Sequence, residues 1–291
     1  MFAEVIIGGL VLGCLYALMG LAMSFTYKAT DLANFAQGEM AMVTTFVCFV
    51  VWKSVGWSFL AALGISLLSA MILGTALAGL LQVRNQRQSH LSALMITLGV
   101  QLLLFGLAGW KFGAEPVRFG LPLRSDRVWL EVMGAPLTEL NAVSILLAIS
   151  CMGLLYVLMQ YTRFGLAMRA SQQHPRAAQS SGIPYRWMQV AAFGISAVVG
   201  AIAGILVAPV STLEPNMMWE PLLKGFAAAV LGGMKHLPGV VIGGLLLGTG
   251  ENLVGVYLWV EGKSLMAFAL IVLVLLFRPQ GIFTRRNNLN W

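Results

Sequence analysis

The chain has 291 residues, of which 59% are hydrophobic and only 10% are charged, and its mean hydropathy is +0.84. Soluble domains carry about 25% charged residues, so this composition excludes a soluble protein and indicates an integral membrane protein. The formal net charge of +7 is expected to come from Lys and Arg in cytoplasmic loops, and no nucleic-acid partner is expected.

Apolar runs divide the chain into candidate membrane helices. Runs of about 20 residues, the length needed to span a bilayer, lie at about 5–27, 58–81, 90–110, 141–161, 187–209 and 238–258, and shorter runs lie at about 38–54, 221–234 and 264–278. None alternates with period 2, so helices follow. We therefore expect an all-α polytopic membrane protein: one transmembrane domain over residues 1–291, with eight or nine transmembrane helices, of which 221–234 is short or re-entrant.

Loop charge predicts the orientation of these spans. With the N-terminus outside and the C-terminus in the cytoplasm, most loop Lys and Arg residues fall inside and nearly all loop acids outside. The first run has no basic segment before it and no cleavage site after it, so it is expected to be a retained helix. The segment 111–140 is then an extracytoplasmic loop, and 162–186 is cytoplasmic.

Polar residues at the start of the short second run are the first candidates for a translocation path, because ionisable groups at membrane depth usually face a cavity or a partner. Asn34, Gln37 and Glu39 lie there around Gly38. A local unwinding at Gly38 would turn all three toward one cavity. The alternative for Glu39 is that it complements the dipole at a helix N-terminus.

Two further polar pairs lie inside apolar runs. Thr97 and Gln101 are four residues apart and so share a helix face. Glu251 and Asn252 lie within the 238–258 run, where Glu251 is either a solute contact or a buried, hydrogen-bonded packing group. With Asn34, Gln37 and Glu39, these four complete the predicted translocation path.

No catalytic or metal site is predicted. The three His residues are scattered, and the three Cys residues lie in apolar runs without CxxC spacing. No GxxxxGK[ST] loop is present to hold ATP phosphates, so the chain is expected to bind no cofactor itself and to be no enzyme.

A basic insert, "RFGLAMRASQQHPRAAQSSGIPYRW" at 163–187, interrupts the apolar chain. It resembles the cytoplasmic coupling segment of permeases in the branched-chain amino acid (Liv-type) ABC transporter family. Three other stretches are similar to the same family: "GLVLGCLYALMGLAMSFTYKATDLANFAQGEM" at 9–40, "LKGFAAAVLGGMKHLPGVVIGGLLLGTGENL" at 223–253 and "LLFRPQGIF" at 275–283. The resemblance covers nearly the whole chain.

The resemblance implies a permease subunit of an ABC importer in a bacterial inner membrane. Its partners would be two cytosolic ATPase subunits that hold ATP and Mg²⁺, an extracytoplasmic substrate-binding protein, and a second related permease or another copy of itself. The coupling segment would dock on an ATPase through Gly165, Arg169, Ala170, Pro175, Ala178, Gly182 and Ile183. Gly165 and Gly182 are expected to allow turns at its two ends.

The chain departs from the family pattern at Arg176, where an acid is common, and at Gln37, where a His is frequent. The segment 111–140 and the turn at 259–264 match less well. The solute is therefore open between branched-chain amino acids, urea, short amides and other small polar molecules. A secondary transporter or channel, with buried acids as ion sites, is the alternative function.

Overall fold

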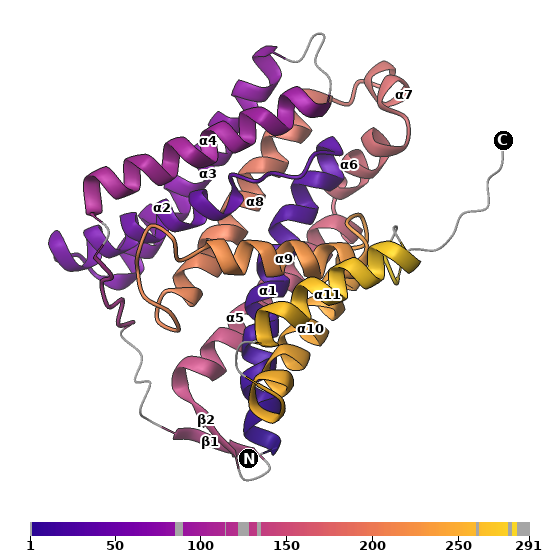
Figure 1. Cartoon of the computed structure of the whole chain (residues 1–291). Coiled ribbons are helices and arrows are strands. Elements are labelled where there is room, and N and C mark those ends of the chain that lie inside the picture. The colour runs from indigo at the N-terminus through magenta and orange to yellow at the C-terminus, as the bar shows by residue number, and fades with distance from the viewer. Residues whose placement is uncertain are drawn as a thin grey trace.

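Helices make up most of the chain that the computed structural model describes, which comprises residues 2–84, 90–113, 115–121, 128–132, 135–259, 262–278 and 281–283 (Figure 1). In chain order the helices are α1 (Phe2–Thr30), α2 (Gln37–Phe49), α3 (Phe59–Arg84), α4 (His90–Phe112), α5 (Glu139–Tyr161), α6 (Arg163–Gln173), α7 (Pro175–Ser180), α8 (Tyr185–Val207), α9 (Trp219–Gly232), α10 (Leu237–Tyr257) and α11 (Gly262–Phe277). A short π-helix, Val50–Ser54, extends α2.

Six helices within the described ranges are long and apolar enough to cross a membrane: α1, α3, α4, α5, α8 and α10. They coincide with the six long apolar runs of the sequence, which confirms the prediction that these runs form helices of membrane-spanning length. The shorter runs become α2 with its π-helical extension, the 14-residue α9 and the 16-residue α11.

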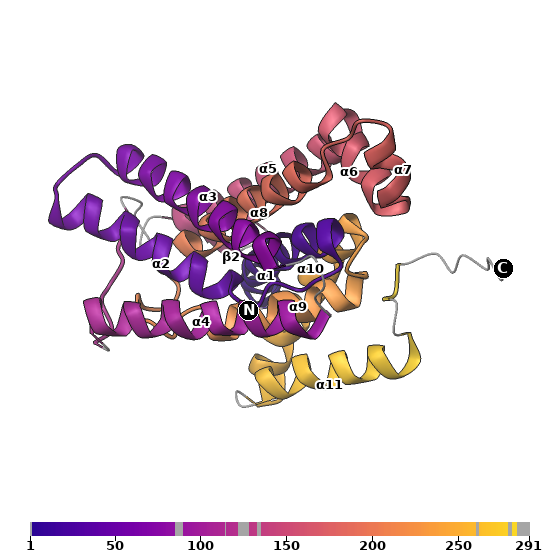
Figure 2. The same cartoon turned by 90° about the horizontal axis from the view of Figure 1, so that it is seen from above.

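The bundle has a buried centre and an apolar periphery. In the most apolar stretches of α1 and α8, 72% of the residues are buried, whereas in that of α4 only 17% are buried. In Figure 2, α1 lies near the middle of the molecule and α4 and α11 lie at its edge. The exposed apolar side chains of the outer helices are those that lipid or a second membrane subunit would cover.

Glycine allows α1 to pack directly on α10. A Cβ atom added to Gly248 would lie 2.2 Å from the backbone nitrogen of Gly13, and one added to Gly244 would lie 2.7 Å from the Cα of Ala17. Contacts this close are available only to residues without a side chain, as in small-residue packing motifs of membrane helices. Glycines therefore make possible the close contact between α1 and α10 at the centre of the fold.

A β-hairpin departs from the all-helical expectation. Strands β1 (Val128–Val132) and β2 (Ala135–Thr138) pair antiparallel within the segment 111–140, and an isolated bridge joins Val117 to Leu213. Two short strands carry too little periodicity to be predicted from sequence. The hairpin lies beside the N-terminus (Figure 1), and the side chain of Thr138 then caps α5 by accepting a hydrogen bond from Asn141 N at 3.3 Å.

The basic insert forms the helix pair α6 and α7 at the end of the molecule opposite the hairpin (Figure 1). Thr162 caps α6, and Pro175 begins α7. Gly182 has φ +81° and ends the pair, as expected of a turn glycine. Gly165 lies in the first turn of α6, where a Cβ would come within 2.2 Å of the carbonyl oxygen of Met159, so the absence of a side chain allows α6 to begin close to the end of α5.

Candidate functional site

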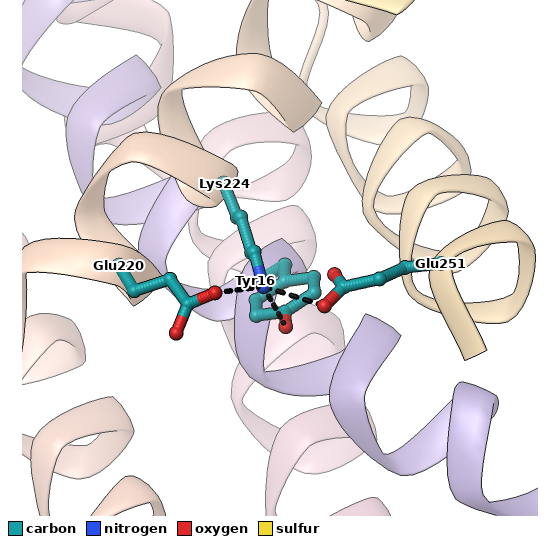
Figure 3. A network of polar contacts seen from close by, with 4 residues as sticks. All are labelled: Tyr16, Glu220, Lys224 and Glu251. Carbon is teal, nitrogen blue, oxygen red and sulfur yellow. Dashed lines mark hydrogen bonds and ion pairs between the residues drawn. The ribbon is translucent and has the colours of Figure 1, made fainter. Parts of the chain in front are cut away.

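A lysine on α9 is the centre of the main polar network of the bundle (Figure 3). The ammonium of Lys224 lies 2.5 Å from Glu251 Oε1 on α10 and 2.6 Å from Glu220 Oε1, one helical turn back on α9. It also donates a hydrogen bond of 3.2 Å to the hydroxyl of Tyr16 on α1. The three donors of the ammonium thus meet three acceptors from three helices.

Burial differs sharply across this network. The side chains of Lys224 and Glu251 are 6% and 4% exposed, whereas that of Glu220 is 61% exposed. Glu251 Oε2 is buried and has no hydrogen-bond partner. A charge taken out of water is tolerated only when it is paired, so Lys224 and Glu251 each make the burial of the other feasible.

The glycine contacts of α1 place Tyr16 in this network. The backbone of α1 touches α10 at Gly13 and touches α9 at Gly20, where an added Cβ would lie 2.8 Å from the carbonyl oxygen of Gly225. Tyr16 is therefore held between the two helices that carry Glu251 and Lys224. A side chain at either glycine would separate the helices that supply the network.

A second polar network joins α1, α2 and α8. Gln37, which is completely buried, donates from Nε2 to the carbonyl oxygen of Ser196 at 2.9 Å and accepts from Asn34 Nδ2 at 3.2 Å and from Ser196 Oγ at 3.1 Å. Ser196 Oγ also lies 2.6 Å from the carbonyl oxygen of Ala22. The structure thus brings two predicted path residues together, in a tight contact between helices.

Glu39 lies apart from these contacts. It is 4% exposed, and its Oε2 has no hydrogen-bond partner. The expected unwinding at Gly38 was wrong: α2 begins at Gln37 and continues through Gly38, which packs against Leu222. The irregular segment lies earlier, at 31–36, where Asp31 adopts φ +56° and Asn34 Oδ1 accepts from Ala36 N at 3.1 Å.

The remaining predicted path residues are spread over the bundle. Thr97 is buried on α4 and bonds to the carbonyl oxygen of Leu94 in its own helix, and Gln101 is half-buried one turn further on. Asn252 Nδ2 donates to the carbonyl oxygen of Val5 at 2.6 Å, which ties α10 to the start of α1. These residues do not gather with Asn34 and Gln37 into one site.

The predicted coupling residues lie on α6, on α7 and in the turn that follows. Arg169 packs back along α6, with Nη1 3.4 Å from Gln160 Oε1 on α5, and Ala170 is half-buried. Ala178 is buried, and its carbonyl oxygen accepts from Ile183 N at 3.0 Å. The backbone of α6 and α7 is therefore folded on its own contacts before any partner binds.

A groove opens beside this helix pair, with a volume of about 540 Å³. Its lining comes from α7, from the start of α8 with the turn before it, and from the end of α3. The lining residues are Gln82, Gln179, Ile183, Pro184, Tyr185, Arg186, Trp187 and Gln189. Gln82 Nε2 donates to the carbonyl oxygen of Arg186 at 2.9 Å, so α3 supports the start of α8. The groove offers both polar and aromatic surface to a partner.

No metal centre appears in the part of the chain that the structure describes, since no three His, Cys, Asp or Glu residues come together there. Cys14 and Cys48 are buried free thiols, and Cys151 is a half-buried one.

Comparison with known proteins identifies the family. The model of a family described as the permease component of branched-chain amino acid transport systems matches residues 5–275. LivH of Escherichia coli strain K12, a high-affinity branched-chain amino acid transport system permease protein, is 30% identical, with 98% of this chain and 96% of LivH aligned. The chain belongs to this permease family.

Further relatives agree with this family. BraD of Pseudomonas aeruginosa, named as a permease protein of the same kind of transport system, is 26% identical, with 98% of this chain and 96% of BraD aligned. The solved structure of PsaBC from Streptococcus pneumoniae in complex with Fab superposes with a TM-score of 0.52 at 9% identity, covering 96% of this chain and 92% of that one. That likeness shows a shared fold.

Membership settles the broad class of the protein. The chain is a multi-pass membrane permease and a transport subunit of an ABC importer, and the secondary-transporter or channel alternative is not favoured. A permease of this class associates with ATPase subunits and a substrate-binding protein.

Sequence reasoning missed the partners of Glu251. Lys224 and Glu220 were visible as a pair four residues apart, a spacing that places them on one helix face. Tyr16 gave no comparable signal, because its place depends on α1 docking against α9 and α10. Ser196 was hidden for the same reason, as an ordinary small residue in a glycine-rich run.

Proposed function

We propose that this permease carries branched-chain amino acids into the cytoplasm, driven by ATP hydrolysis in two cytosolic ATPase subunits that hold ATP and Mg²⁺. The observation that carries the proposal is the family match over residues 5–275. The matched region includes the basic helices α6 and α7, which lie between α5 and α8 in the chain. The 162–186 segment would be the ATPase-coupling loop of a permease domain that covers residues 1–291. Closure of the ATPases would move this loop and switch the bundle between inward-open and outward-open states.

We propose an orientation with the N-terminus outside, as the loop charges of the sequence predict. With the N-terminus outside, every pass through α1, α2, α3, α4, α5, α8, α9, α10 and α11 changes sides, so the chain crosses or enters the membrane nine times if α9 is counted. The hairpin segment, 111–140, is then extracytoplasmic, and α6, α7 and the C-terminus are cytoplasmic. Most basic loop residues would then lie on the cytoplasmic side of a bacterial inner membrane.

The partners follow from the same arrangement. The extracytoplasmic face would receive an amino acid from a binding protein, and the exposed apolar periphery would meet lipid and a second permease, either a relative or another copy of this chain. Asn34, Gln37, Glu39, Thr97, Gln101, Glu251 and Asn252 stay our proposed path residues, and three of them, Asn34, Gln37 and Glu251, lie in the two polar networks.

Uptake by a reconstituted complex tests the function. The permease, its ATPases and its binding protein are placed in proteoliposomes, and entry of radiolabelled leucine is measured with ATP on the ATPase side. ATP-dependent accumulation is expected. Leucine entry at the same rate without ATP would instead indicate a channel.

Labelling of single cysteines tests the orientation. In a chain whose native cysteines are replaced, Arg118→Cys in the hairpin segment and Gln179→Cys in α7 both place a thiol at an exposed position. A membrane-impermeant maleimide added to intact cells is expected to label the first variant and to spare the second. Labelling of Gln179→Cys from outside would overturn the orientation and the coupling role of α6 and α7.

A further inference from the structure

The membrane-embedded core contains few charges, and two of them meet. Among the residues that the structure describes, Lys224 is the only buried Lys or Arg, and Glu39 and Glu251 are the only buried acids. Lys224 and Glu251 form an ion pair at 2.5 Å between two helices that pack closely on α1 through glycines. Ionisable groups at membrane depth are usually functional, so this pair requires an explanation beyond packing.

One carboxylate in contact with the pair lies at the exposed surface of α9. Glu220, in the first turn of α9, touches the Lys224 ammonium at 2.6 Å, yet its own side chain is 61% exposed. Trp219, beside it, is 51% exposed. Figure 3 shows the Lys224 ammonium between Glu220 on one side and Glu251 on the other. The Lys224 ammonium therefore contacts one exposed carboxylate and one buried carboxylate.

The pair is unequal in its hydrogen bonding. Lys224 uses its three donors on Glu220, Glu251 and Tyr16, but Glu251 Oε2 is buried without any partner. An ionised carboxylate has acceptor capacity for several donors, and buried polar atoms in native proteins are seldom left without one. The spare acceptor is thus suited to an ammonium that arrives during transport.

We infer that Lys224 and Glu251, entered past Glu220, are a binding station for the two charged ends of a zwitterionic amino acid. The ammonium group of the solute binds the Glu251 carboxylate. The carboxylate of the solute replaces Glu251 as the partner of the Lys224 ammonium. Each charge keeps an opposite partner throughout the exchange, so no unpaired charge is left in the low-dielectric core. Urea and uncharged amides cannot make this exchange. The inference rests on the proposed function and names its substrate class.

A purely structural ion pair makes the opposite prediction. Replacing both partners of a buried ion pair by apolar residues of similar volume is often neutral or stabilising, whereas removing one partner leaves an uncompensated charge. The double replacement of Lys224→Met with Glu251→Met therefore removes both charges and leaves no unpaired charge buried, whereas either single replacement would leave one. A pair that only joins α9 to α10 would leave transport intact in this variant.

The experiment uses the complete importer, reconstituted with its ATPases and binding protein. For each variant, yield of the assembled complex, radiolabelled leucine uptake and ATP hydrolysed per leucine are measured. For the double variant we expect normal yield and continued ATP hydrolysis, with leucine uptake lower by about tenfold or more, the value of one charge-assisted contact. The ATP hydrolysed per leucine should rise by the same factor, which a general loss of stability would not cause.

A second variant decides the matter if the double variant assembles poorly. Glu220→Gln changes an exposed carboxylate and so leaves the buried pair in place, and it is expected to lower leucine uptake severalfold at normal yield. The matched control is Lys235→Met, which removes an exposed ion pair with Asp31 whose side chains are both 56% exposed. Uptake by the control should equal that of the unmodified protein.

Two results overturn the inference. Leucine uptake at the unmodified rate by the double variant would show that the pair is structural, and unchanged uptake by Glu220→Gln would show that solute does not enter past this carboxylate. Both leave the proposed function standing, because the unmodified importer still carries leucine. If the unmodified importer hydrolyses ATP but carries no leucine, the proposed function and the inference fail together.

Discussion

A single methyl group at the contact between α1 and α10 is expected to destabilise the bundle. In Gly248→Ala the new Cβ would lie 2.2 Å from the nitrogen and 2.4 Å from the Cα of Gly13. Both are backbone atoms, so no side-chain rotation relieves the clash. Ordinary contact begins at 3.4 Å, so the two backbones must separate by roughly 1 Å, a case of overpacking.

The magnitude follows from two opposing effects. Overpacking costs about 1–3 kcal/mol, and backbone-to-backbone contact places this site near the upper end. Alanine recovers about 0.5–1 kcal/mol because it loses less conformational entropy than glycine in a helix. The net loss of stability is about 1–2 kcal/mol, which lowers the melting temperature by roughly 2–8 °C for a chain of this size.

Thermal unfolding of the purified permease in detergent provides the assay, with Gly99→Ala as the matched control. Gly99 also lies in a membrane helix, α4, but a Cβ there meets nothing within 4 Å. We expect a lower melting temperature for Gly248→Ala and an unchanged or higher one for the control. Equal melting temperatures for the two variants would refute the assignment of this glycine contact as the centre of the fold.

The remaining predictions concern the second polar network, Glu39, and the proposed coupling segment of α6, α7 and the turn that follows. Gln37→Leu removes three hydrogen bonds in the core and is expected to lower stability by about 1–3 kcal/mol; an unchanged melting temperature would contradict this. Glu39→Gln is expected to lower leucine uptake strongly with assembly intact, whereas near-normal uptake would leave it only a helix N-terminal role worth about 0.3–1 kcal/mol. Arg169→Glu and Gly182→Glu should abolish uptake while the protein inserts normally, and undiminished co-purification of the ATPase with both variants would count against the coupling role.

Much of the fold is predictable from sequence because the bilayer restricts what an apolar run can do. A run of about 20 apolar residues must satisfy its backbone internally, so its position and helical form follow directly. Pairing of helices far apart in the chain is different, because many apolar faces are nearly equivalent in lipid.

The break between α1 and α2 lies at a different place from the one that the sequence predicted. Gly38 has the weakest helix propensity of its segment, so unwinding was predicted there. The structure instead places the break at 31–36, where Asn34 bonds to the backbone of Ala36 in an irregular turn. Asn forms such turns readily, and the small size of Gly38 serves to bring α2 against Leu222.

The two polar networks connect the helix pair at one end of the molecule to the buried charges. The α6–α7 pair is followed by α8, which carries Ser196 and holds both α1 and α2 through hydrogen bonds. The same α1 carries Tyr16, the third acceptor of Lys224. If α6 and α7 have the proposed coupling role, their displacement would reach α1 through α8, and the glycine contacts of α1 with α9 and α10 leave little room for independent movement. Because interfaces packed this closely switch between discrete arrangements rather than deforming continuously, the Lys224 network is the place where a change in the spacing of these helices would exchange one ion-pair partner for another.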